Sequence, residues 1–382
     1  MQYTDSYNNE IEAFIKDNDL SAFNGCKLLF SGGTGLICSY FIDALLATDY
    51  SFKLTLLCTN EKRAKERFCL HKDDSRIEYK EANLLEPLAV STDYDFILSA
   101  ASFTDPKNYA AYPVETITTN VLGTHNLLEA ARAQKNLKKF LVFSSCEVYG
   151  EETSVLTEET KGIVDCLNVR SCYNESKRLI ETMAISYGKE YDVNAVIGRF
   201  SRVYGPTMKL TDSKALSQFL LNAINKKDIV LKSQGTQKFS YCYVSDAAAS
   251  IISLLLRGDN NNAYNITNDL EIFELKKIAQ IIANKAGVDV KFELPINGEQ
   301  MGYSAATIAI QDASKIKKLG WSPKVGLNKG IESTLDIVSQ RIEKERKIWG
   351  FWIGSTLNYL GWTICWERAG WKLVVIVIFI PI

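Results

Sequence analysis

Tyr173 and Lys177 are four residues apart, and their types and spacing could support proton transfer. On a helix, residues four apart lie on one face, so the lysine ammonium would lie near the phenol. A nearby positive charge lowers the pKa of a phenol toward that of a useful general base. The same spacing also suits an aromatic ring packed against a lysine stem, so the pair alone does not decide between the two.

A second polar group is predicted at the end of a buried strand, about one strand–helix unit upstream. Residues 144–150 read Ser-Ser-Cys-Glu-Val-Tyr-Gly. Ligands of parallel sheets bind beyond the carboxyl ends of the strands. A hydroxyl presented there, that of Ser145, can complete a proton-transfer group with Tyr173 and Lys177.

A glycine-rich turn lies near the start of the chain. Gly32, Gly33 and Gly35 follow an apolar run and precede a helical pattern from Leu36 to Leu46. Such a turn lets the backbone approach a pyrophosphate, while the helix N-terminus supplies N–H donors. A glycine triplet can be only a tight turn, but the flanking strand and helix favour dinucleotide binding.

The residue that ends the second strand usually separates NAD from NADP enzymes. An acidic side chain there accepts the ribose hydroxyls, and a basic one receives the 2′-phosphate. Thr59 and Asn60 occupy this point, and Glu61 and Arg63 follow. The choice between NAD and NADP stays open on these residues.

The elements that must position these groups alternate between strand and helix, which predicts an α/β fold with a doubly wound parallel sheet. The predicted strands are 27–30, 53–58, near 77, 96–99, 139–144 and 194–197, and the predicted helices are 8–16, 36–46, 61–68, 120–134, 173–187 and 330–341. We expect a helical extension over 1–25 and a dinucleotide-binding (Rossmann) domain over 26–200. A smaller lobe, mainly substrate-binding, is expected over 201–345, with a segment near 240–266 returning to the first domain.

Composition excludes several functions. The 45 acidic and 44 basic side chains nearly balance, so charge does not recruit nucleic acid. Nine cysteines without a C-x-x-C pair and only two histidines suggest neither a metal site nor a disulfide framework. The first twenty residues are polar and acidic, without the apolar core of a secretory signal, so we expect a cytoplasmic protein.

The sequence resembles the extended short-chain dehydrogenase/reductase superfamily, in particular its NAD-dependent nucleotide-sugar epimerases, 4,6-dehydratases and UDP-glucuronate decarboxylases. The similarity runs from about residue 27 to residue 338. The motifs that carry it, in the expected order, are the glycine turn, Pro113-Val-Glu-Thr with Asn120-Val-Leu-Gly-Thr, the 144–150 segment, Tyr173-Asn-Glu-Ser-Lys177, Arg199 with Tyr204-Gly-Pro206, Tyr243-Val-Ser-Asp246, Tyr264-Asn-Ile266 and Leu319-Gly-Trp321-Ser-Pro323.

The resemblance implies a reaction at C4 of a nucleotide-bound sugar. Tyr173 would remove the proton of the 4-hydroxyl as hydride passes to the nicotinamide. Lys177 would hold the nicotinamide ribose and tune Tyr173, and Ser145 would hydrogen-bond the same oxygen. Glu147 matches an acidic residue used after oxidation. The resulting 4-ketone makes a C5 carboxylate a β-keto acid that loses carbon dioxide easily, and the reduced cofactor then returns its hydride.

The resemblance also implies the cofactor contacts and the assembly. The implied cofactor is NAD, with NADP not excluded, and a homodimer is usual in the superfamily. Besides Tyr173 and Lys177, the implied cofactor-binding residues are Gly32, Gly33, Thr34, Gly35, Leu36, Ile37, Asn60, Arg63, Asn83, Leu84, Ala100, Ala101 and Asn120.

Three departures from the family pattern concern the cofactor turn and the active site. The third glycine of the turn is Cys38, which alters the packing of helix on strand. The acidic residue usual after the third strand is Asn83. Cys146 stands where a 4,6-dehydratase has an aspartic acid that protonates the departing hydroxyl, and a thiol replaces it poorly, which argues against a dehydratase.

A fourth departure concerns substrate binding. The family's arginine, a contact for the substrate pyrophosphate, falls on Phe239, whose ring offers no donors to phosphate. Lys238 or Arg202 could supply the missing charge. Arg199 follows a strand and could contact a substrate phosphate, although pairing with a nearby acid is an equal alternative.

The leading hypothesis is therefore a UDP-glucuronate decarboxylase-like enzyme, with a 4-epimerase or 4,6-dehydratase next. An NADP-dependent ketoreductase would use the same Ser, Tyr and Lys but consume its cofactor. A catalytically weak, cofactor-binding scaffold is the alternative that Cys38, Asn83 and Phe239 support.

The last segment of the chain, residues 346–382, is expected to form a separate hydrophobic, tryptophan-rich tail. No charged side chain occurs from Ile348 to Trp366, a length close to the roughly 20 residues that span a bilayer. Residues 341–347 before it are basic, which would keep the enzyme cytoplasmic. A membrane-associating tail over 348–382, a buried oligomer contact and a non-native extension are the three interpretations that compete.

Overall fold

The centre of the molecule is a seven-stranded parallel sheet. The computed structural model describes residues 3–89, 93–294 and 307–360, with side chains up to residue 346. The strand order is β11-β7-β5-β4-β1-β2-β3. These strands are β1 (Lys27–Ser31), β2 (Lys53–Cys58), β3 (Ile77–Glu81), β4 (Phe96–Ser99), β5 (Lys139–Ser145), β7 (Ala195–Phe200) and β11 (Asn262–Ile266). The predicted doubly wound α/β fold is confirmed.

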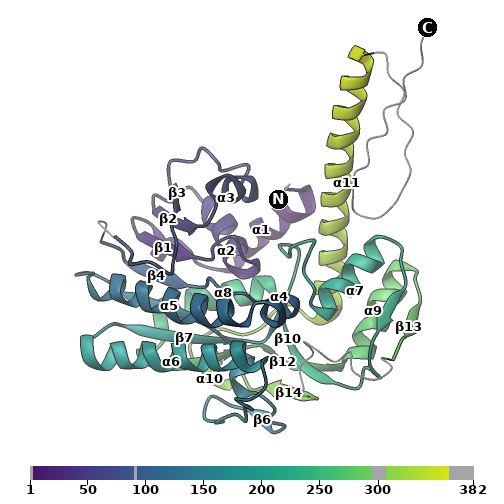
Figure 1. Cartoon of the computed structure of the whole chain (residues 1–382). Coiled ribbons are helices and arrows are strands. Elements are labelled where there is room, and N and C mark those ends of the chain that lie inside the picture. Colours follow the sequence, from purple (N-terminus) through teal and green to yellow (C-terminus); the bar gives the residue numbers. More distant parts are fainter. Residues whose placement is uncertain (1–2, 90–92, 295–306, 361–382) are drawn as a thin grey trace.

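Helices cover both faces of this sheet (Figure 1). Helices α2 (Leu36–Leu46) and α8 (Val244–Arg257) pack together over one face, and α5 (Pro113–Arg132) and α6 (Ser171–Tyr191) over the other. The strands are apolar on both sides for this reason, and all four residues of β4 are buried. The short α3 (Glu61–Arg67) lies beside β3.

Helix α5 begins seven residues earlier than the predicted Asn120. Its first helical residue is Pro113, whose fixed φ and missing N–H suit the first position of a helix. Helix α6 likewise continues past Tyr187 to Tyr191, where Asp192 adopts a left-handed conformation with φ 56° and ends it.

The second lobe is built on a smaller sheet of order β12-β10-β14-β6, with β8 paired to β10. Strand β11 and helix α8 return from this part of the chain to the first sheet. The remaining elements are η1 (Ser21–Phe23), α4 (Pro106–Ala111), η2 (Cys146–Tyr149), β6 (Val155–Leu156), β8 (Arg202–Tyr204), α7 (Ala215–Ile224), β9 (Ile229–Leu231), β10 (Lys238–Tyr243), β12 (Asn268–Glu274), α9 (Leu275–Ala286), β13 (Val290–Phe292), β14 (Ile308–Gln311) and α10 (Ser314–Lys317).

The leading helix, α1 (Asp5–Asp17), is held against α2 and α3 through one buried carboxylate. Asp43 of α2 accepts hydrogen bonds from the hydroxyls of Tyr3 and Tyr7, each at 2.6 Å. The guanidinium of Arg67 on α3 forms an ion pair with the same carboxylate at 2.7 Å. Three elements therefore share one buried charge.

Helix α1 also contacts the last helix, α11 (Leu327–Leu360). Gln340 donates to Ser6 Oγ at 2.7 Å, and Lys344 donates to the carbonyl of Tyr3 at 2.7 Å. Glu10 accepts from Ser333, and also from Tyr243 of β10 at 2.8 Å. Helix α1 thus contacts α2 of the first sheet's helical layer as well as β10 of the second sheet and α11.

Helix α11 is longer than the predicted 330–341 and projects from the body of the molecule (Figure 1). Among the described residues, none of the helices combines the length and apolarity needed to cross a bilayer. The expected tail begins in α11, and its residues 361–382 lie outside the described part of the chain.

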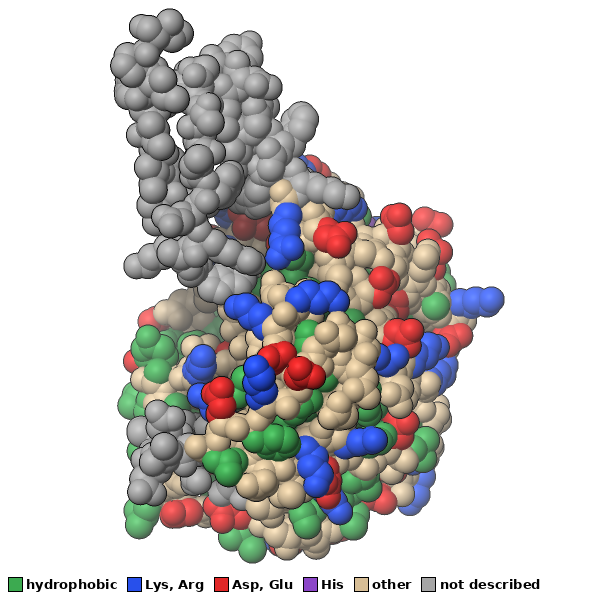
Figure 2. Space-filling view, turned by 90° about the vertical axis from the view of Figure 1, so that its right-hand side faces the viewer, with side chains coloured by type: hydrophobic (Ala, Val, Ile, Leu, Met, Phe, Trp, Pro, Cys, Tyr) green, Lys and Arg blue, Asp and Glu red, His purple; other side chains and the backbone are tan. Residues whose placement is uncertain are grey.

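Charges of both signs are mixed on the face of the molecule that Figure 2 presents. Lysine and arginine side chains lie among aspartate and glutamate side chains there, in keeping with the net charge of −1. That face does not have the one-sided basic character of a nucleic-acid-binding surface.

Candidate active site

The residues predicted to do chemistry lie at one edge of the seven-stranded sheet. The parallel register pairs Ser31 with Ser99, and Ser145 with Phe200, so the carboxyl ends of β1, β4, β5 and β7 meet there. Ser31 Oγ accepts hydrogen bonds from the backbone N–H groups of Ala100 at 3.1 Å and Ala101 at 3.3 Å. This ties the exit of β4 to the glycine turn.

Tyr173 lies in the first turn of α6 and is buried. Its ring stacks on that of Tyr109 from α4, with centroids 5.3 Å apart and planes 21° apart. Burial raises the pKa of Tyr173 above its ordinary value, and a hydrogen bond with Ser145 opposes that rise. Ser145 therefore lies close enough to Tyr173 to affect its pKa.

Lys177 lies one turn further along α6. Its Nζ donates to the carbonyl of Phe143 in β5 at 2.8 Å and lies 5.7 Å from the centroid of the Tyr173 ring. Burial lowers the pKa of Lys177 to about 8. The ammonium therefore lies near the phenol, as the spacing predicts, and it is held in place by the strand that carries Ser145.

Glu147 projects from η2, the short helix that follows β5. One carboxylate oxygen accepts from Arg170 at 3.0 Å and the other from Arg202 at 3.4 Å. Burial alone would raise the pKa of Glu147, but these two guanidinium groups outweigh it and hold the pKa below its ordinary value. Glu147 is therefore a half-buried, ionised carboxylate between two cations.

Arg170 and Tyr109 were not predicted from the sequence. The Arg170 guanidinium lies 5.6 Å from the centroid of the Tyr109 ring, and it also donates to the Tyr109 hydroxyl at 3.4 Å. Arg170 precedes Tyr173 by three residues, one helical turn, and that spacing could have revealed it. Tyr109 comes from α4 and carries no spacing signal relative to the other residues.

Asn120 connects α5 to α6 beneath the site. Its amide donates to Ser176 Oγ at 2.8 Å, and Ser176 Oγ donates to the carbonyl of Tyr173 at 2.9 Å. Within the described residues, the buried side-chain oxygen of Asn120 has no hydrogen-bond partner. It is an acceptor available to a ligand at this edge.

The glycine turn has the shape that a dinucleotide needs. Gly32 has φ +70°, and a Cβ there would lie 2.6 Å from the carbonyl carbon of Ala100. Gly35 precedes α2, and no side chain caps the first turn of that helix, so its N–H groups can face a phosphate. Thr34, Leu36 and Ile37 are half-buried around this turn, whereas Cys38 is fully buried in the core below it.

At the predicted ribose side, Asn60 and Asn83 are uncharged and make local hydrogen bonds, while the side chain of Arg63 is exposed. Asn60 Oδ1 accepts from the backbone of Arg63 at 2.8 Å and so caps α3. Asn83 is exposed, and its Oδ1 accepts from the backbone of Leu85 at 3.1 Å. Leu84 packs near Gly123 of α5. The described residues thus fit NAD: the glycines make space for the phosphates, and Asn120 offers an acceptor.

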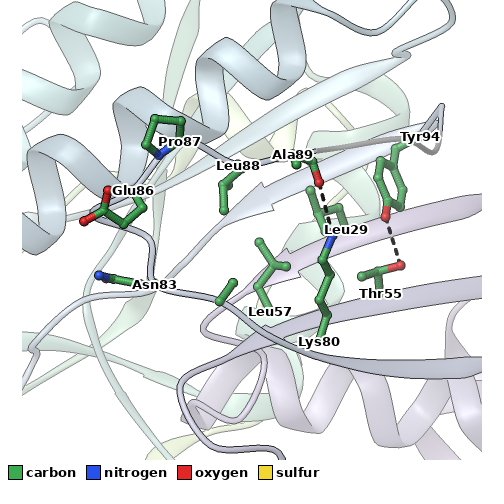
Figure 3. A pocket seen from close by; sticks show the side chains of 11 residues that line it. Leu29, Thr55, Leu57, Lys80, Asn83, Glu86, Pro87, Leu88, Ala89 and Tyr94 are labelled. Atoms are coloured by element: carbon green, nitrogen blue, oxygen red, sulfur yellow. Dashed lines mark hydrogen bonds between the residues drawn. The ribbon is translucent and has the colours of Figure 1, made fainter.

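A separate cavity of about 320 Å³ opens beside β1, β2 and β3 (Figure 3). Its mostly apolar lining includes Leu29, Leu57 and Leu88, and Tyr94 donates to Thr55 across it at 3.0 Å. Asn83 is the only predicted site residue in this lining. The catalytic group of α6 and β5 lies elsewhere, so this cavity is not the site of the chemistry.

The structure corrects the substrate-phosphate role expected for Arg199. Its guanidinium binds Glu181 at 2.7 Å, the Tyr149 hydroxyl at 3.0 Å and the Glu158 carbonyl at 3.0 Å. The alternative, pairing with a nearby acid, is the one observed. Arg199 joins β7 to α6 and has its donors occupied.

Only one of the two cations expected to compensate for Phe239 lies against its ring. The guanidinium of Arg202 lies over the Phe239 ring, 3.6 Å from its centroid. Lys238 is exposed, while Phe239 is buried. Because neighbouring strand residues point to opposite faces, the structure brings Arg202, and not Lys238, onto Phe239.

Comparisons with known proteins identify relatives of this chain. Residues 28–267 match the model of the NAD-dependent epimerase/dehydratase family. UDP-glucuronic acid decarboxylase 6 of Arabidopsis thaliana is 31% identical over 80% of this chain and 86% of that protein. UDP-glucuronic acid decarboxylase 1 of Xenopus tropicalis is 29% identical over 84% of this chain and 73% of that protein.

Solved structures share the fold. The dTDP-glucose 4,6-dehydratase of Bacillus anthracis, in complex with NAD, superposes with a TM-score of 0.70 at 21% identity, covering 84% of this chain and 98% of that chain. The UDP-glucuronic acid 4-epimerase of Bacillus cereus, in complex with UDP-glucuronic acid and NAD, superposes with a TM-score of 0.70 at 22% identity. The match covers 82% of this chain and 99% of that chain.

Proposed function

Because this chain belongs to the NAD-dependent epimerase/dehydratase family, we propose that it oxidises C4 of a nucleotide sugar transiently and decarboxylates UDP-glucuronate. The observation that carries the proposal is the position of Glu147. It is half-buried, follows the end of the strand that carries Ser145, and lies close enough to the buried Tyr173 to affect the pKa of that residue. The relatives of this chain that are 29–31% identical are named for this reaction.

The chain's own residues account for the proton transfers. When bound, NAD would supply a hydride acceptor for C4 that is regenerated within the cycle. Tyr173 accepts the proton of the 4-hydroxyl, and Ser145 donates to the same oxygen. Lys177 stabilises the phenolate by its positive charge and holds the nicotinamide ribose. The C5 carboxylate then leaves as carbon dioxide, and its electron pair forms an enolate with the 4-ketone. We assign Glu147 to this step after oxidation. The enolate takes up a proton from water at C5, and Tyr173 returns its proton to the C4 oxygen when that carbon is reduced again.

Cys146 favours decarboxylation over dehydration. A dehydratase needs an acid to protonate a departing hydroxyl. Burial raises the pKa of the Cys146 thiol to about 11, so the thiol is a poor proton donor at neutral pH. The site therefore has no strong acid where a dehydratase would use one.

The direct test is to incubate the purified protein with UDP-glucuronate, UDP-glucose and dTDP-glucose, and to weigh the products by mass spectrometry. Loss of carbon dioxide from UDP-glucuronate is the expected result. An unchanged mass with an altered sugar would identify a 4-epimerase, and loss of water a 4,6-dehydratase. Net consumption of NADPH would identify a ketoreductase, and absence of any turnover would favour a cofactor-binding scaffold.

A homodimer through α5 and α6 is part of the proposal. These helices pack side by side, and α5 exposes Val114, Ile117 and Leu122, while α6 exposes Leu179 and Ile185. Exposed apolar side chains grouped on a helix pair are typical of a protein contact. Light scattering after gel filtration is expected to give twice the chain mass, and Leu179→Glu is expected to reduce it.

Membrane association through residues 348–382 is the last part of the proposal. Its support is the absence of charge from Ile348 to Trp366 beside a basic segment. The full chain is expected to float with anionic lipid vesicles, whereas a chain ending at residue 346 is expected to stay in the unbound fraction. Equal behaviour of the two chains would contradict the proposal.

A further inference from the structure

The guanidinium of Arg202 lies over the ring of Phe239 at the active site. Strand β8 pairs in parallel with β10, with Arg202 opposite Tyr241, and the Arg202 guanidinium carbon is 3.6 Å from the centroid of the Phe239 ring. A guanidinium stacked on an aromatic face keeps its N–H donors in its own plane. Phe239 therefore acts as a support that orients those donors sideways into the site.

The donors of Arg202 are only weakly used by the described residues. One donates to Cys146 Sγ at 3.9 Å and another to Glu147 at 3.4 Å, which is long for a charge-assisted bond. Its side chain is 22% exposed. Arg199, three residues earlier, makes bonds of 2.7–3.2 Å to Glu181, Tyr149 and Glu158. Of these two arginines, Arg202 is the one that can accept a ligand.

Glu147 has a second cationic partner, which lies closer to it than Arg202 does. Arg170 donates to its other oxygen at the shorter distance of 3.0 Å. The three groups together carry two positive charges and one negative charge, next to Tyr173, whose pKa responds to Glu147. The cluster has one surplus positive charge and is complementary to an anionic oxygen group.

Lys238 is poorly placed to do the same. It is the exposed first residue of β10, on the opposite strand face from Phe239. Its register partner is Glu274 on β12, whose pKa it helps to lower. The lysine charge is therefore directed toward solvent and Glu274, away from Glu147.

We propose that Arg202 binds the negatively charged oxygens of the nucleotide sugar, with Phe239 as its support, and so replaces the arginine that the family pattern has at position 239. The charge of the pattern is kept, but it is supplied from β8 instead of β10. The inference rests on the proposed function, because it concerns the substrate of the same site.

The test measures binding in a Tyr173→Phe parent, in which bound sugar is not turned over. UDP-glucuronate, UDP-glucose and UDP are titrated by calorimetry into the NAD-loaded protein. Adding Arg202→Gln is expected to weaken binding about 10- to 100-fold, the effect of losing a charge-assisted contact. A loss confined to UDP-glucuronate assigns Arg202 to the sugar carboxylate, and an equal loss for all three ligands assigns it to the diphosphate.

Companion variants separate Arg202 from other causes. Arg132→Gln is the matched control, because the Arg132 guanidinium also stacks on a ring, that of Tyr191 at 4.0 Å, but on the surface. It is expected to leave all three affinities unchanged. Phe239→Leu keeps apolar volume without the ring, and a 3- to 10-fold loss is expected. The double variant Arg202→Gln/Phe239→Arg places a guanidinium on β10 instead of β8. It is expected to recover the affinity for the three ligands that Arg202→Gln alone loses.

Two results would overturn the inference. One is that Arg202→Gln, still folded and still loaded with NAD, binds all three ligands as tightly as the parent. The other is that Lys238→Ala causes the loss instead. If the parent binds none of the three ligands, the proposed function itself fails, and this outcome is distinct from a parent that binds them without using Arg202.

Discussion

Two buried groups with opposite pKa shifts lie one turn apart on α6. Burial raises the pKa of the Tyr173 phenol, and burial lowers the pKa of the Lys177 ammonium to about 8. Each shift favours the neutral form of its group. The raised pKa of Tyr173 is opposite to the lowered pKa expected from the nearby ammonium, because burial is the largest influence on the phenol.

The Lys177 shift predicts how stability depends on pH. Between pH 8 and pH 10 the folded protein releases the Lys177 proton, while the unfolded chain, with an ordinary lysine pKa of 10.5, retains it. The unfolded state binds more protons there, so stability rises with pH. Relative to Lys177→Met, the free energy of unfolding of the cofactor-free wild type should rise by about 2 kcal/mol from pH 8 to pH 10.

Urea denaturation of both proteins at pH 7, 8, 9 and 10 checks this expectation. Below about pH 7 the difference between them should be constant, because both states of the wild type then hold the proton. Parallel curves over the whole range would show that Lys177 titrates as an ordinary lysine.

Tyr173→Phe tests the base directly. It removes only the hydroxyl and keeps the ring that stacks on Tyr109. Turnover should fall about 100- to 10,000-fold, the usual contribution of a general base. The content of bound NAD should not change. Tyr187→Phe, on the same helix but hydrogen-bonded to Glu129 away from the site, should keep normal turnover.

The residues that could be predicted at this scale are those whose partners are close in sequence or at equivalent strand ends. Tyr173 and Lys177 share a helix face, and Ser145 and Glu147 follow one strand. Tyr109 was missed because only the tertiary packing of α4 on α6 brings it to Tyr173. Arg199 stayed ambiguous because its role depends on Glu181, which lies on another element.

Among the elements, the turn between β1 and α2 determines how closely a cofactor can approach. Gly32→Ala would place a methyl group 2.6 Å from the Ala100 backbone at φ +70°. Backbone cannot yield as a side-chain end can, so we expect a loss of about 1–3 kcal/mol of stability and at least tenfold weaker NAD binding.

Gly287→Ala is the matched control for that substitution. Gly287 has φ +68°, and a Cβ there would meet nothing within 4 Å. It should show the conformational penalty of about 1 kcal/mol without any change in NAD affinity. Calorimetric NAD titrations measure the affinity for NAD of both variants, and thermal denaturation measures their stability. An equal loss of NAD affinity in both variants would argue against the role of the contact with Ala100.

Element boundaries were predictable where local signals were strong. Strand β2 and helix α2 begin and end as predicted. The start of α5 at Pro113 was missed, because from sequence alone a proline at the first position of a helix is hard to distinguish from a proline in the loop before it. The second sheet was not predicted. Its strands are short, and β10 pairs with segments far away in sequence, such as β14. Such pairing has no local periodic signal.

On the scale of the whole molecule, α1 and Asp43 connect parts that the chain order separates. Asp43→Ala would leave the Arg67 guanidinium without its buried carboxylate and both tyrosine hydroxyls without that acceptor. We expect a loss of about 3–5 kcal/mol in the free energy of unfolding. Asp73→Ala, whose side chain is 87% exposed, should change it by less than about 0.5 kcal/mol.

The measurement is urea denaturation followed by tryptophan fluorescence at neutral pH. Tyr7→Phe removes one of the hydrogen bonds to Asp43 and should cost about 1 kcal/mol. If Asp43→Ala were no more harmful than Tyr7→Phe, the carboxylate would not be the common point that joins α1, α2 and α3.

The contacts of α1 with α11 also bear on how the protein is made. Ser6 meets Gln340, and Tyr3 meets Lys344, across more than 330 intervening residues. A ribosome delivers α1 among the first residues of this sequence and α11 only after both sheets. The side of α1 that α11 covers must therefore remain without this contact during most of translation. The contacts between α1 and α11 can form only after α11 has left the ribosome.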